Sequence, residues 1–251
     1  MTALPDVSGV PHPATWPFYP HRWFGRFVIR RRFAVAEHGT DLVPPEGPVI
    51  LAANHIGVAD GALLGLFGPR PVHVLTKQEM FRGRTGTFLR RVGQVPLDRF
   101  HVDVRALKTC LRVLADGHCV GVFPEGTRGA GELARFHRGA AYLALVSGAP
   151  VVPVTFFGTR APGAGSHALP PTGGRVDIVY GAPYRTAQQP WPRSKLLVEV
   201  TALDLRVHML VAIDAARTLT GRSLPGPMPP GQAEADPSTS VTPGANPGGT
   251  P

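Results

Sequence analysis

Cysteine is scarce in this chain, with Cys110 and Cys119 as the only two among 251 residues. Neither belongs to a CxxC pair or to a Cys/His spacing typical of a zinc site, and two thiols cannot form a disulfide framework. The sequence therefore predicts no metal site and a reducing compartment, in which both thiols are buried and inert.

Long hydrophobic runs are also missing. No stretch approaches the roughly 20 consecutive apolar residues that a helix needs to cross a bilayer. The first residues lack the basic segment and the apolar segment of a secretory signal. We therefore expect a cytoplasmic protein, either soluble or attached to a membrane surface.

Acidic residues are outnumbered, 17 against 26 lysines and arginines, which gives a formal net charge of +9. Such a surplus favours anionic partners: phospholipid surfaces, phosphorylated substrates, coenzyme A, acyl carrier protein or nucleic acid. Charge alone does not choose among these classes.

The two ends of the chain have little with which to build a core. Residues 225–251 contain eight prolines and five glycines, no lysine or arginine, and almost no large apolar side chain. Because such a segment cannot offset its ordering entropy by burial, we expect residues 223–251 to be a disordered tail. Residues 1–15 are expected to be flexible, which leaves one folded domain over residues 16–222.

Within that domain, apolar stretches of strand length alternate with segments of helical periodicity. The alternation predicts an α/β fold, a single domain with helices flanking a largely parallel central sheet and an amphipathic segment before it. The expected strands are 49–53, 72–75, 95–97, 119–123, 151–156 and 176–180. The expected helices are 61–67, 86–92, 102–116, 139–147 and 192–219, with one further segment over 23–35.

Polar clusters follow three of these strands, at the sheet edge where ligands of parallel sheets bind. The first cluster contains His55 and, five residues later, Asp60. A histidine can act as a general base near neutral pH, and an aspartate across a tight loop can fix its tautomer. The alternatives are an aspartate that only caps the next helix and a histidine that is only structural.

Charged residues at the other strand ends suit an anionic ligand. Lys77, Arg99 and Arg128 each follow a strand, and three cations that converge on one crevice would bind a phosphate. Glu125 could hold Arg128 or an acceptor hydroxyl, whereas each of these charges taken alone also suits a solvated surface. No serine or cysteine has the setting of an activated nucleophile, which favours direct transfer over a covalent intermediate.

Together these residues resemble the glycerolipid acyltransferase family, which includes the lysophosphatidic acid acyltransferases. Residues 54–60 match its NHxxxxD motif, and residues 123–128 match FPEGTR in full. The resemblance covers about residues 45–185, and FPEGTR is its most specific part. Weaker matches are the segment 93–99, the V-P-V strand 152–154 and the K-x-E-L-F-like segment 77–81.

The resemblance implies an O-acyltransferase that moves a fatty acyl group from acyl-CoA or acyl-carrier protein to the hydroxyl of a lysophospholipid, foremost 1-acylglycerol-3-phosphate. It makes His55 the base and Asp60 the residue that orients it, with no covalent acyl-enzyme, cofactor or metal. Where the family often has a polar residue this chain has Gly57, which removes a hydroxyl that could contact the acceptor head group. The residues that would bind the acceptor are Lys77, Arg99, Glu125, Gly126, Thr127 and Arg128.

Residues 16–35 predict a membrane-surface segment. Residues 16–33 interleave seven aromatic residues with five arginines, as in a helix whose rings enter the headgroup layer while its guanidinium groups meet the phosphates. The alternative is a core-packed helix with a solvated basic edge. The resemblance favours the membrane, at the inner face of the cell membrane, and argues against nucleic acid as a partner.

Three other functions stay open on the sequence alone. The same chemistry could serve another lyso-lipid or a glycolipid acceptor. A non-catalytic, basic lipid-binding protein could keep the motifs for structure, and a hydrolase of acyl thioesters would use water in place of the acceptor.

Overall fold

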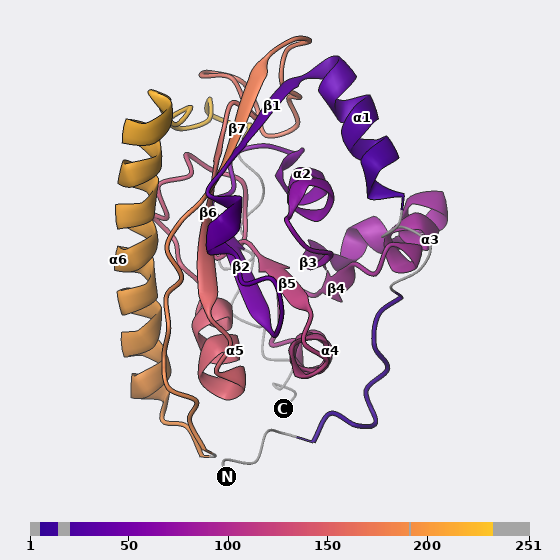
Figure 1. Ribbon diagram of the computed structural model, residues 1–251, viewed down its shortest axis with the longest axis vertical. Helices are drawn as coiled ribbons and strands as arrows, with labels where there is room; N and C mark the ends of the chain where they lie inside the picture. The colour runs from indigo at the N-terminus through magenta and orange to yellow at the C-terminus, as the bar shows by residue number, and fades with distance from the viewer. Residues whose placement is uncertain (1–5, 15–20, 191, 233–251) are drawn as a thin grey trace, which may run out of the picture.

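The computed structural model describes residues 6–14, 21–190 and 192–232. Its strands form one seven-stranded sheet in the order β1-β7-β6-β2-β5-β3-β4 (Figure 1). Neighbouring strands are parallel except for β6 and β7, so the predicted α/β fold with a largely parallel sheet is confirmed. The strands are β1 Ala34–His38, β2 Val49–Ala53, β3 Val72–Lys77, β4 Val95–Leu97, β5 Cys119–Val122, β6 Val151–Phe157 and β7 Arg175–Tyr180.

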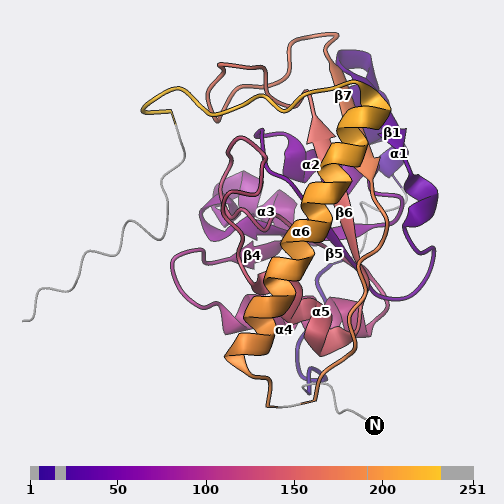
Figure 2. The same ribbon diagram turned by 90° about the vertical axis from the view of Figure 1, so that its left-hand side faces the viewer.

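Helices cover both faces of the sheet (Figures 1 and 2). On one face α4, α5 and α6 pack together and against the strands, and on the other face α2 packs on β3 and α1 packs on α2. Two short 3₁₀ helices, η1 and η2, complete the elements. The bounds are α1 Arg22–Arg32, α2 Asp60–Phe67, α3 Gly83–Arg91, α4 Val104–Ala115, α5 Gly139–Ser147, α6 Lys195–Thr220, η1 Thr40–Leu42 and η2 Gln78–Phe81.

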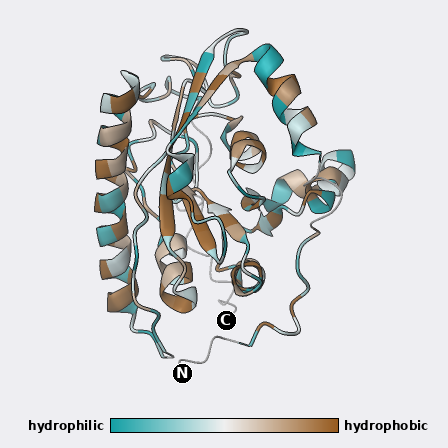
Figure 3. Cartoon of the chain, viewed as in Figure 1, coloured by the Kyte–Doolittle hydropathy of each residue, from teal (hydrophilic) through white to brown (hydrophobic). Residues whose placement is uncertain are grey.

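The central strands are apolar along their whole length, as Figure 3 shows, because parallel strands between two helical layers are buried on both faces. Every residue of β2 is fully buried. Helix ends follow local capping: the Asp103 side chain accepts a hydrogen bond from the Ala106 amide and Ser194 accepts one from Leu197. These caps explain why α4 and α6 begin a few residues later than the hydrophobic pattern predicted.

The expected single segment over 23–35 is wrong, because the chain there forms two elements. Helix α1 ends at Arg32, and β1 follows as an edge strand that pairs parallel with β7. The partner of Ala34 in this pairing is Arg175, 141 positions later in the chain. Pairing over that distance left no local signal in the sequence.

Helix α1 departs from the expected arrangement in two of its five arginines. Trp23, Phe24 and Phe27 are exposed, but the guanidinium groups of Arg22 and Arg26 donate to the carbonyls of residues 66 and 68, at the end of α2. Cations at a helix C-terminus satisfy its free carbonyls and its dipole. The outer face of α1 is therefore aromatic, with its first two arginines turned inward, while residues 16–20 of the predicted membrane segment lie outside the described residues.

Parts of both expected flexible ends are described. In the N-terminal segment, Val7 is buried and the His12 ring contacts the rings of His73 and His118 edge-on. After α6, Leu224 packs against the core and Pro225 is buried, while residues 233–251 lie outside the described residues. Within the part of the chain that the structure describes, no helix combines the length and apolarity needed to cross a membrane.

Candidate active site

The first polar cluster begins where β2 leaves the sheet. Asn54 is fully buried, and its side chain accepts from the Phe156 amide at 2.7 Å and donates to the Phe156 carbonyl at 3.3 Å. These two bonds continue the β2–β6 pairing by one residue through a side chain. The position of the next residue, His55, is thereby fixed just beyond the carboxyl end of β2.

Asp60 holds the loop that carries His55. Its Oδ2 atom accepts three hydrogen bonds of 2.8 Å, from His55 Nδ1 and from the amides of Ile56 and Gly57. Asp60 is the first residue of α2 and is fully buried, and the N-cap residue Ala59 makes no side-chain cap bond. The carboxylate therefore organises the turn before the helix, and the alternative of a mere helix cap does not describe it.

The bond to Asp60 assigns the tautomer of His55, because a carboxylate only accepts and Nδ1 must therefore carry the proton. The ring stacks on Phe123 at 4.2 Å between centroids, and its side chain is 18% exposed. Nε2 makes no hydrogen bond with any described residue. The geometry leaves Nε2 as an accessible lone pair on a ring whose position is fixed on the other side.

Glu125 supports the same loop from β5. Its Oε1 accepts a hydrogen bond of 2.8 Å from the His55 backbone amide, and the side chain is buried. Burial raises the pKa of Glu125 to about 7, and the nearby Asp60 charge adds to that rise. This carboxyl therefore changes its charge near neutral pH, directly beneath His55.

The cationic residues reach the site from separate strand ends. Arg99, after β4, donates to the Gly126 carbonyl at 3.3 Å, and the buried Arg128 donates to the Ser166 carbonyl at 2.8 Å. Gly126 has a φ of +72°, and a Cβ there would lie 2.6 Å from the His137 ring, so only glycine fits this turn. Through this contact, the turn after β5 lies next to the segment that follows β4.

Two other predicted site residues lie near this group. Lys77 ends β3 opposite Leu97 of β4, at the same sheet edge, but β5 stands between its strand and β2. Thr127 is half-buried between Gly126 and Arg128. Of the predicted residues, His55, Asp60 and Glu125 are joined by direct hydrogen bonds, and Arg99 joins them through the Gly126 turn.

Arg160 is a residue that the sequence analysis missed. It is almost fully buried, and its guanidinium donates to four carbonyls at 2.6 to 3.0 Å. Burial of the guanidinium lowers the pKa of Arg160. Its place three residues after β6, at the edge that carries the other clusters, was the available signal. The carbonyls belong to Ile56, Gly129, Ala164 and Gly226, so Arg160 ties together the loops after β2, β5, β6 and α6.

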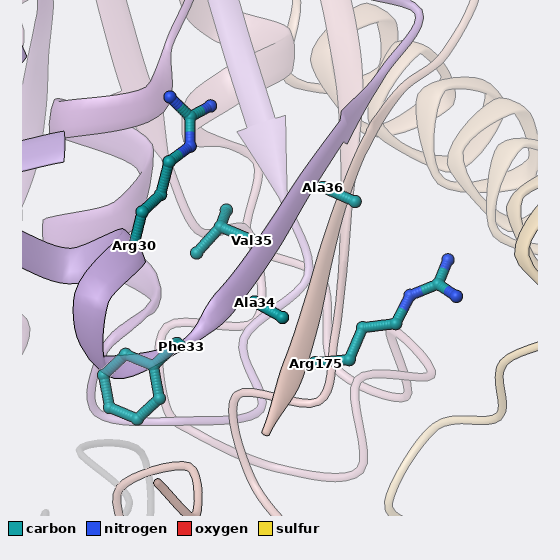
Figure 4. A pocket seen from close by; sticks show the side chains of 6 residues that line it. All are labelled: Arg30, Phe33, Ala34, Val35, Ala36 and Arg175. Carbon is teal, nitrogen blue, oxygen red and sulfur yellow. The ribbon is translucent and has the colours of Figure 1, made fainter. Parts of the chain in front are cut away.

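Neither of two hollows in the described surface is lined by His55. One, of about 340 Å³, is lined by β1 together with Arg30 and Arg175, which Figure 4 shows on either side of that strand. The other, of about 410 Å³, is lined by Arg160, Arg175 and Arg222 among others. Among the described residues, no group of three His, Cys, Asp or Glu side chains is placed to hold a metal ion.

Comparisons with known proteins agree with the motifs. A family model described as Acyltransferase matches residues 34–157. A Bacillus subtilis protein named 1-acyl-sn-glycerol-3-phosphate acyltransferase is 29% identical over 74% of this chain and 92% of its own length. A Chlamydomonas reinhardtii protein of the same activity name is 32% identical over 66% of this chain, and the match spans only 47% of that protein.

A solved structure has the same fold. The crystal structure of the 1-acyl-sn-glycerophosphate (LPA) acyltransferase PlsC from Thermotoga maritima superposes with a TM-score of 0.60. The alignment covers 80% of this chain and 79% of that one, at 24% sequence identity. The solved structure shows that the fold is shared. The family model and the curated relatives agree that the chain belongs to the acyltransferase family that this model describes, as an enzyme of the acyltransferase class.

Proposed function

We propose that this enzyme transfers a fatty acyl group from an acyl thioester, either acyl-CoA or acyl-carrier protein, to 1-acylglycerol-3-phosphate, giving phosphatidic acid. The observation that carries the proposal is the hydrogen bond between His55 Nδ1 and Asp60 Oδ2, which leaves Nε2 accessible. The names of the Bacillus subtilis and Chlamydomonas reinhardtii relatives, both 1-acyl-sn-glycerol-3-phosphate acyltransferases, support this acceptor.

The reaction follows from that geometry in two proton transfers. His55 Nε2 takes the proton of the acceptor hydroxyl as the hydroxyl oxygen attacks the thioester carbon. The resulting imidazolium is stabilised by the buried Asp60 carboxylate. As the carbon–sulfur bond breaks, the imidazolium returns the proton to the departing thiolate, and the ester and a free thiol are released.

Direct transfer is supported by the state of the possible nucleophiles. Burial raises the pKa of Cys110 to about 12 and that of Cys119 to about 11, so neither thiol provides thiolate at neutral pH. The Ser147 hydroxyl donates to the Leu143 carbonyl within α5. Ser166, in the loop after β6, and Ser194, at the start of α6, have no histidine among their hydrogen-bond partners, and the proposed chemistry needs no cofactor.

The acceptor phosphate would meet the turn after β5. The Arg99 guanidinium donates to the Gly126 carbonyl of this turn, and the Arg128 guanidinium donates to the Ser166 carbonyl. We propose that both bind the phosphate, because guanidinium groups bind phosphate bidentately. Thr127 and the Gly126 backbone complete this surface, and Lys77 adds a cation from the end of β3. The acceptor hydroxyl would then lie over His55 Nε2.

Access to a lipid acceptor is the proposed role of α1. Its exposed aromatic side chains, Trp23, Phe24 and Phe27, would enter the interfacial layer of the bilayer. Arg31 and Arg32 are exposed at its C-terminal end and would meet lipid phosphates there. The enzyme would thus work as a peripheral protein on the cytoplasmic face of the cell membrane.

The test compares His55→Ala with His38→Ala in the full-length protein. His38 also pairs with a fully buried carboxylate, Asp177, at 3.0 Å, but it lies on β1 at the far edge of the sheet. We expect His55→Ala to lose acyl transfer by at least about 100-fold while His38→Ala keeps it. Ordinary turnover by folded His55→Ala protein would refute the mechanism.

The acceptor and donor are tested in the same assay. Acyl-CoA and acyl-carrier protein are each supplied with lysophosphatidate, other lysophospholipids, a glycolipid or no acceptor, and the products are identified by mass spectrometry. We expect phosphatidic acid as the main product. Thiol release without an acceptor would indicate a thioesterase, and a preference for another acceptor would overturn the assignment of lysophosphatidate but leave the chemistry.

A further inference from the structure

The hollow of about 410 Å³ lies at the carboxyl end of β6, which is the neighbour of β2 in the sheet. Its lining comes from the segments 158–162, 171–175 and 221–225, and we name it the β6 hollow. Strand β6 is parallel to β2, and β7 runs antiparallel to β6, so that the start of β7 meets the end of β6. The β6 hollow therefore lies at the sheet edge from which His55 projects.

The walls of the β6 hollow carry positive charge and no carboxylate. Three of its eleven lining residues are arginines, and the others are glycine, proline, alanine or serine. Among the described residues, the fully buried Asp177 is the one carboxylate that pairs with these arginines, at 2.7 Å from Arg175 and 3.6 Å from Arg222. One carboxylate leaves a surplus of positive charge in a concave surface, which favours an anionic ligand.

Asp177 fixes Arg175 and leaves part of its guanidinium group for a ligand. The Arg175 Nε atom donates to both carboxylate oxygens at 2.9 and 3.1 Å, and Nη2 donates to Oδ1 at 2.7 Å. The Nη1 atom makes no hydrogen bond with any described residue, and the side chain is 50% exposed. Arg175 is thus held in one orientation with an NH₂ group to donate.

Arg222 is held in a similar way from the segment after α6. Its Nη2 atom donates to the Arg175 carbonyl at 3.2 Å, and its side chain is 36% exposed. Gly158 makes room for this contact, since a Cβ at that position would lie 2.8 Å from Arg222 Nη2. Two guanidinium groups that are oriented before a ligand arrives lose less entropy on binding.

The β6 hollow is joined to the catalytic loop by one side chain. Arg160 lines the hollow, and its Nε atom donates at 2.8 Å to the carbonyl of Ile56, the residue after His55. Arg99 and Arg128, proposed above for the acceptor phosphate, follow β4 and β5, which lie on the other side of β2 in the sheet order. Along that order, His55 stands between the two groups of arginines.

We propose that the β6 hollow binds the nucleotide phosphates of an acyl-CoA donor. The inference rests on the proposed function, because it gives the acyl thioester of that reaction its phosphate site. Two phosphorylated substrates that must meet at one base need separate cationic sites, and transfer requires both to be oriented toward that base. The pantetheine arm of the donor would extend past Arg160 and bring the thioester to His55.

The size of the β6 hollow favours coenzyme A over acyl-carrier protein. Its volume of about 410 Å³ lies within the roughly 300–1,000 Å³ of pockets that hold small molecules, and it exceeds what a single phosphate needs. A carrier protein would cover about 800 Å² of a broad, basic surface. A concave site with two exposed arginines suits a nucleotide instead.

The test compares Arg222→Met with Arg217→Met in the full-length protein. Arg217 lies on α6, lines neither hollow and is 39% exposed, so each variant loses one charge from a similarly exposed position. At saturating lysophosphatidate, we expect Arg222→Met to raise the KM for acyl-CoA at least about tenfold, the effect of one lost hydrogen bond to a charged group. Its KM for lysophosphatidate should stay unchanged, and Arg217→Met should keep both values. An unchanged KM for acyl-CoA in Arg222→Met, or a rise confined to the KM for lysophosphatidate, would overturn the proposal.

Calorimetric titration with coenzyme A, without any acceptor, gives a readout that does not depend on turnover. We expect Arg222→Met to bind coenzyme A at least about tenfold more weakly than the wild type and Arg217→Met. Equal affinities overturn the proposal, as does a wild type that binds no coenzyme A and uses only acyl-carrier protein. The proposal also fails if Arg222→Met loses binding to phosphatidylglycerol vesicles but keeps its affinity for coenzyme A, because the hollow would then hold a lipid headgroup. Binding of coenzyme A through Arg222, with acyl transfer to an acceptor other than lysophosphatidate, would support the β6 hollow and refute only the proposed acceptor.

Discussion

Replacing Asp60 by asparagine tests how the catalytic histidine is held. The substitution keeps size and shape but removes the charge from an atom that accepts three hydrogen bonds of 2.8 Å. The other carboxylate oxygen, Oδ1, is buried without a hydrogen-bond partner among the described residues. An asparagine that keeps its oxygen toward His55 must therefore place its NH₂ group where no acceptor is available.

The expected cost has two parts. A buried, unsatisfied donor costs about 1–3 kcal/mol, and each of the three hydrogen bonds is about 1 kcal/mol weaker to a neutral acceptor than to a carboxylate. We therefore expect a loss of roughly 4–6 kcal/mol of unfolding free energy. Catalysis loses the charge that stabilises the imidazolium in the transition state. General-base catalysis contributes about 10²–10⁴-fold, and kcat should fall by at least about 100-fold.

The matched control is Asp177→Asn. Asp177 is also fully buried and bonded to a histidine, His38, but it lies on β7 and is held by Arg175 as well. Both variants are assayed by thiol release from acyl-CoA with lysophosphatidate, at a temperature where circular dichroism shows each to be folded. A folded Asp60→Asn protein that keeps kcat within about fivefold of wild type would refute the role of Asp60 in catalysis.

Three further predictions concern residues near His55 and Asp60. Burial raises the folded-state pKa of Glu125 from 4.5 to about 7, so the protonated carboxyl stabilises the fold fully below pH 4.5, and this stabilisation is lost as the pH rises through 7. Relative to Glu125→Gln, the wild type should therefore lose about 3 kcal/mol of unfolding free energy between pH 4.5 and pH 8, as measured by urea unfolding. Arg160→Met should lower the free energy of unfolding by at least about 3 kcal/mol, because four carbonyls lose their donor. Arg222→Met, at a half-exposed position, should lower it by less than about 1 kcal/mol in the same urea unfolding experiment. Equal losses would contradict the role of Arg160. Gly57→Ser should lower the melting temperature by several degrees, because the serine Cβ would lie 2.7 Å from the Thr159 carbonyl oxygen, and it should leave the preferred acceptor unchanged. A change of acceptor with unchanged stability would contradict this prediction.

The sequence predicted the elements whose signals are local. The strand over 49–53 and the helix over 139–147 have the predicted bounds, because an unbroken apolar run and a glycine stop mark them without reference to the rest of the chain. Strand β1 was missed because only its pairing with β7 makes it a strand. Its sequence, Ala-Val-Ala-Glu-His, has the mixed burial of a sheet edge and no strong alternation.

The site shows the same division. His55 and Asp60 could be paired from the sequence because five positions separate them across one turn. The partners of Arg160 could not be predicted in this way, because its four carbonyls come from loops up to 104 positions away in the chain. None of these loops has a sequence feature that points to an arginine. The prediction was wrong for Arg22 and Arg26 for a related reason: the C-terminus of α2, whose carbonyls they bind, is close to them only after the chain folds.

The structure gives Gly57 a packing role that its residue type alone did not show. Compared with the family pattern, a glycine here reads as a lost hydroxyl that would have contacted the acceptor head group. In the fold, a Cβ at this position would meet the Thr159 carbonyl oxygen at 2.7 Å and the Thr159 hydroxyl at 2.9 Å, both on the buried exit of β6. A side chain at residue 57 would therefore push against that loop instead of reaching outward to a ligand. Selection among acceptors must then come from groups on the open side of His55, where the turn after β5 and its arginines lie.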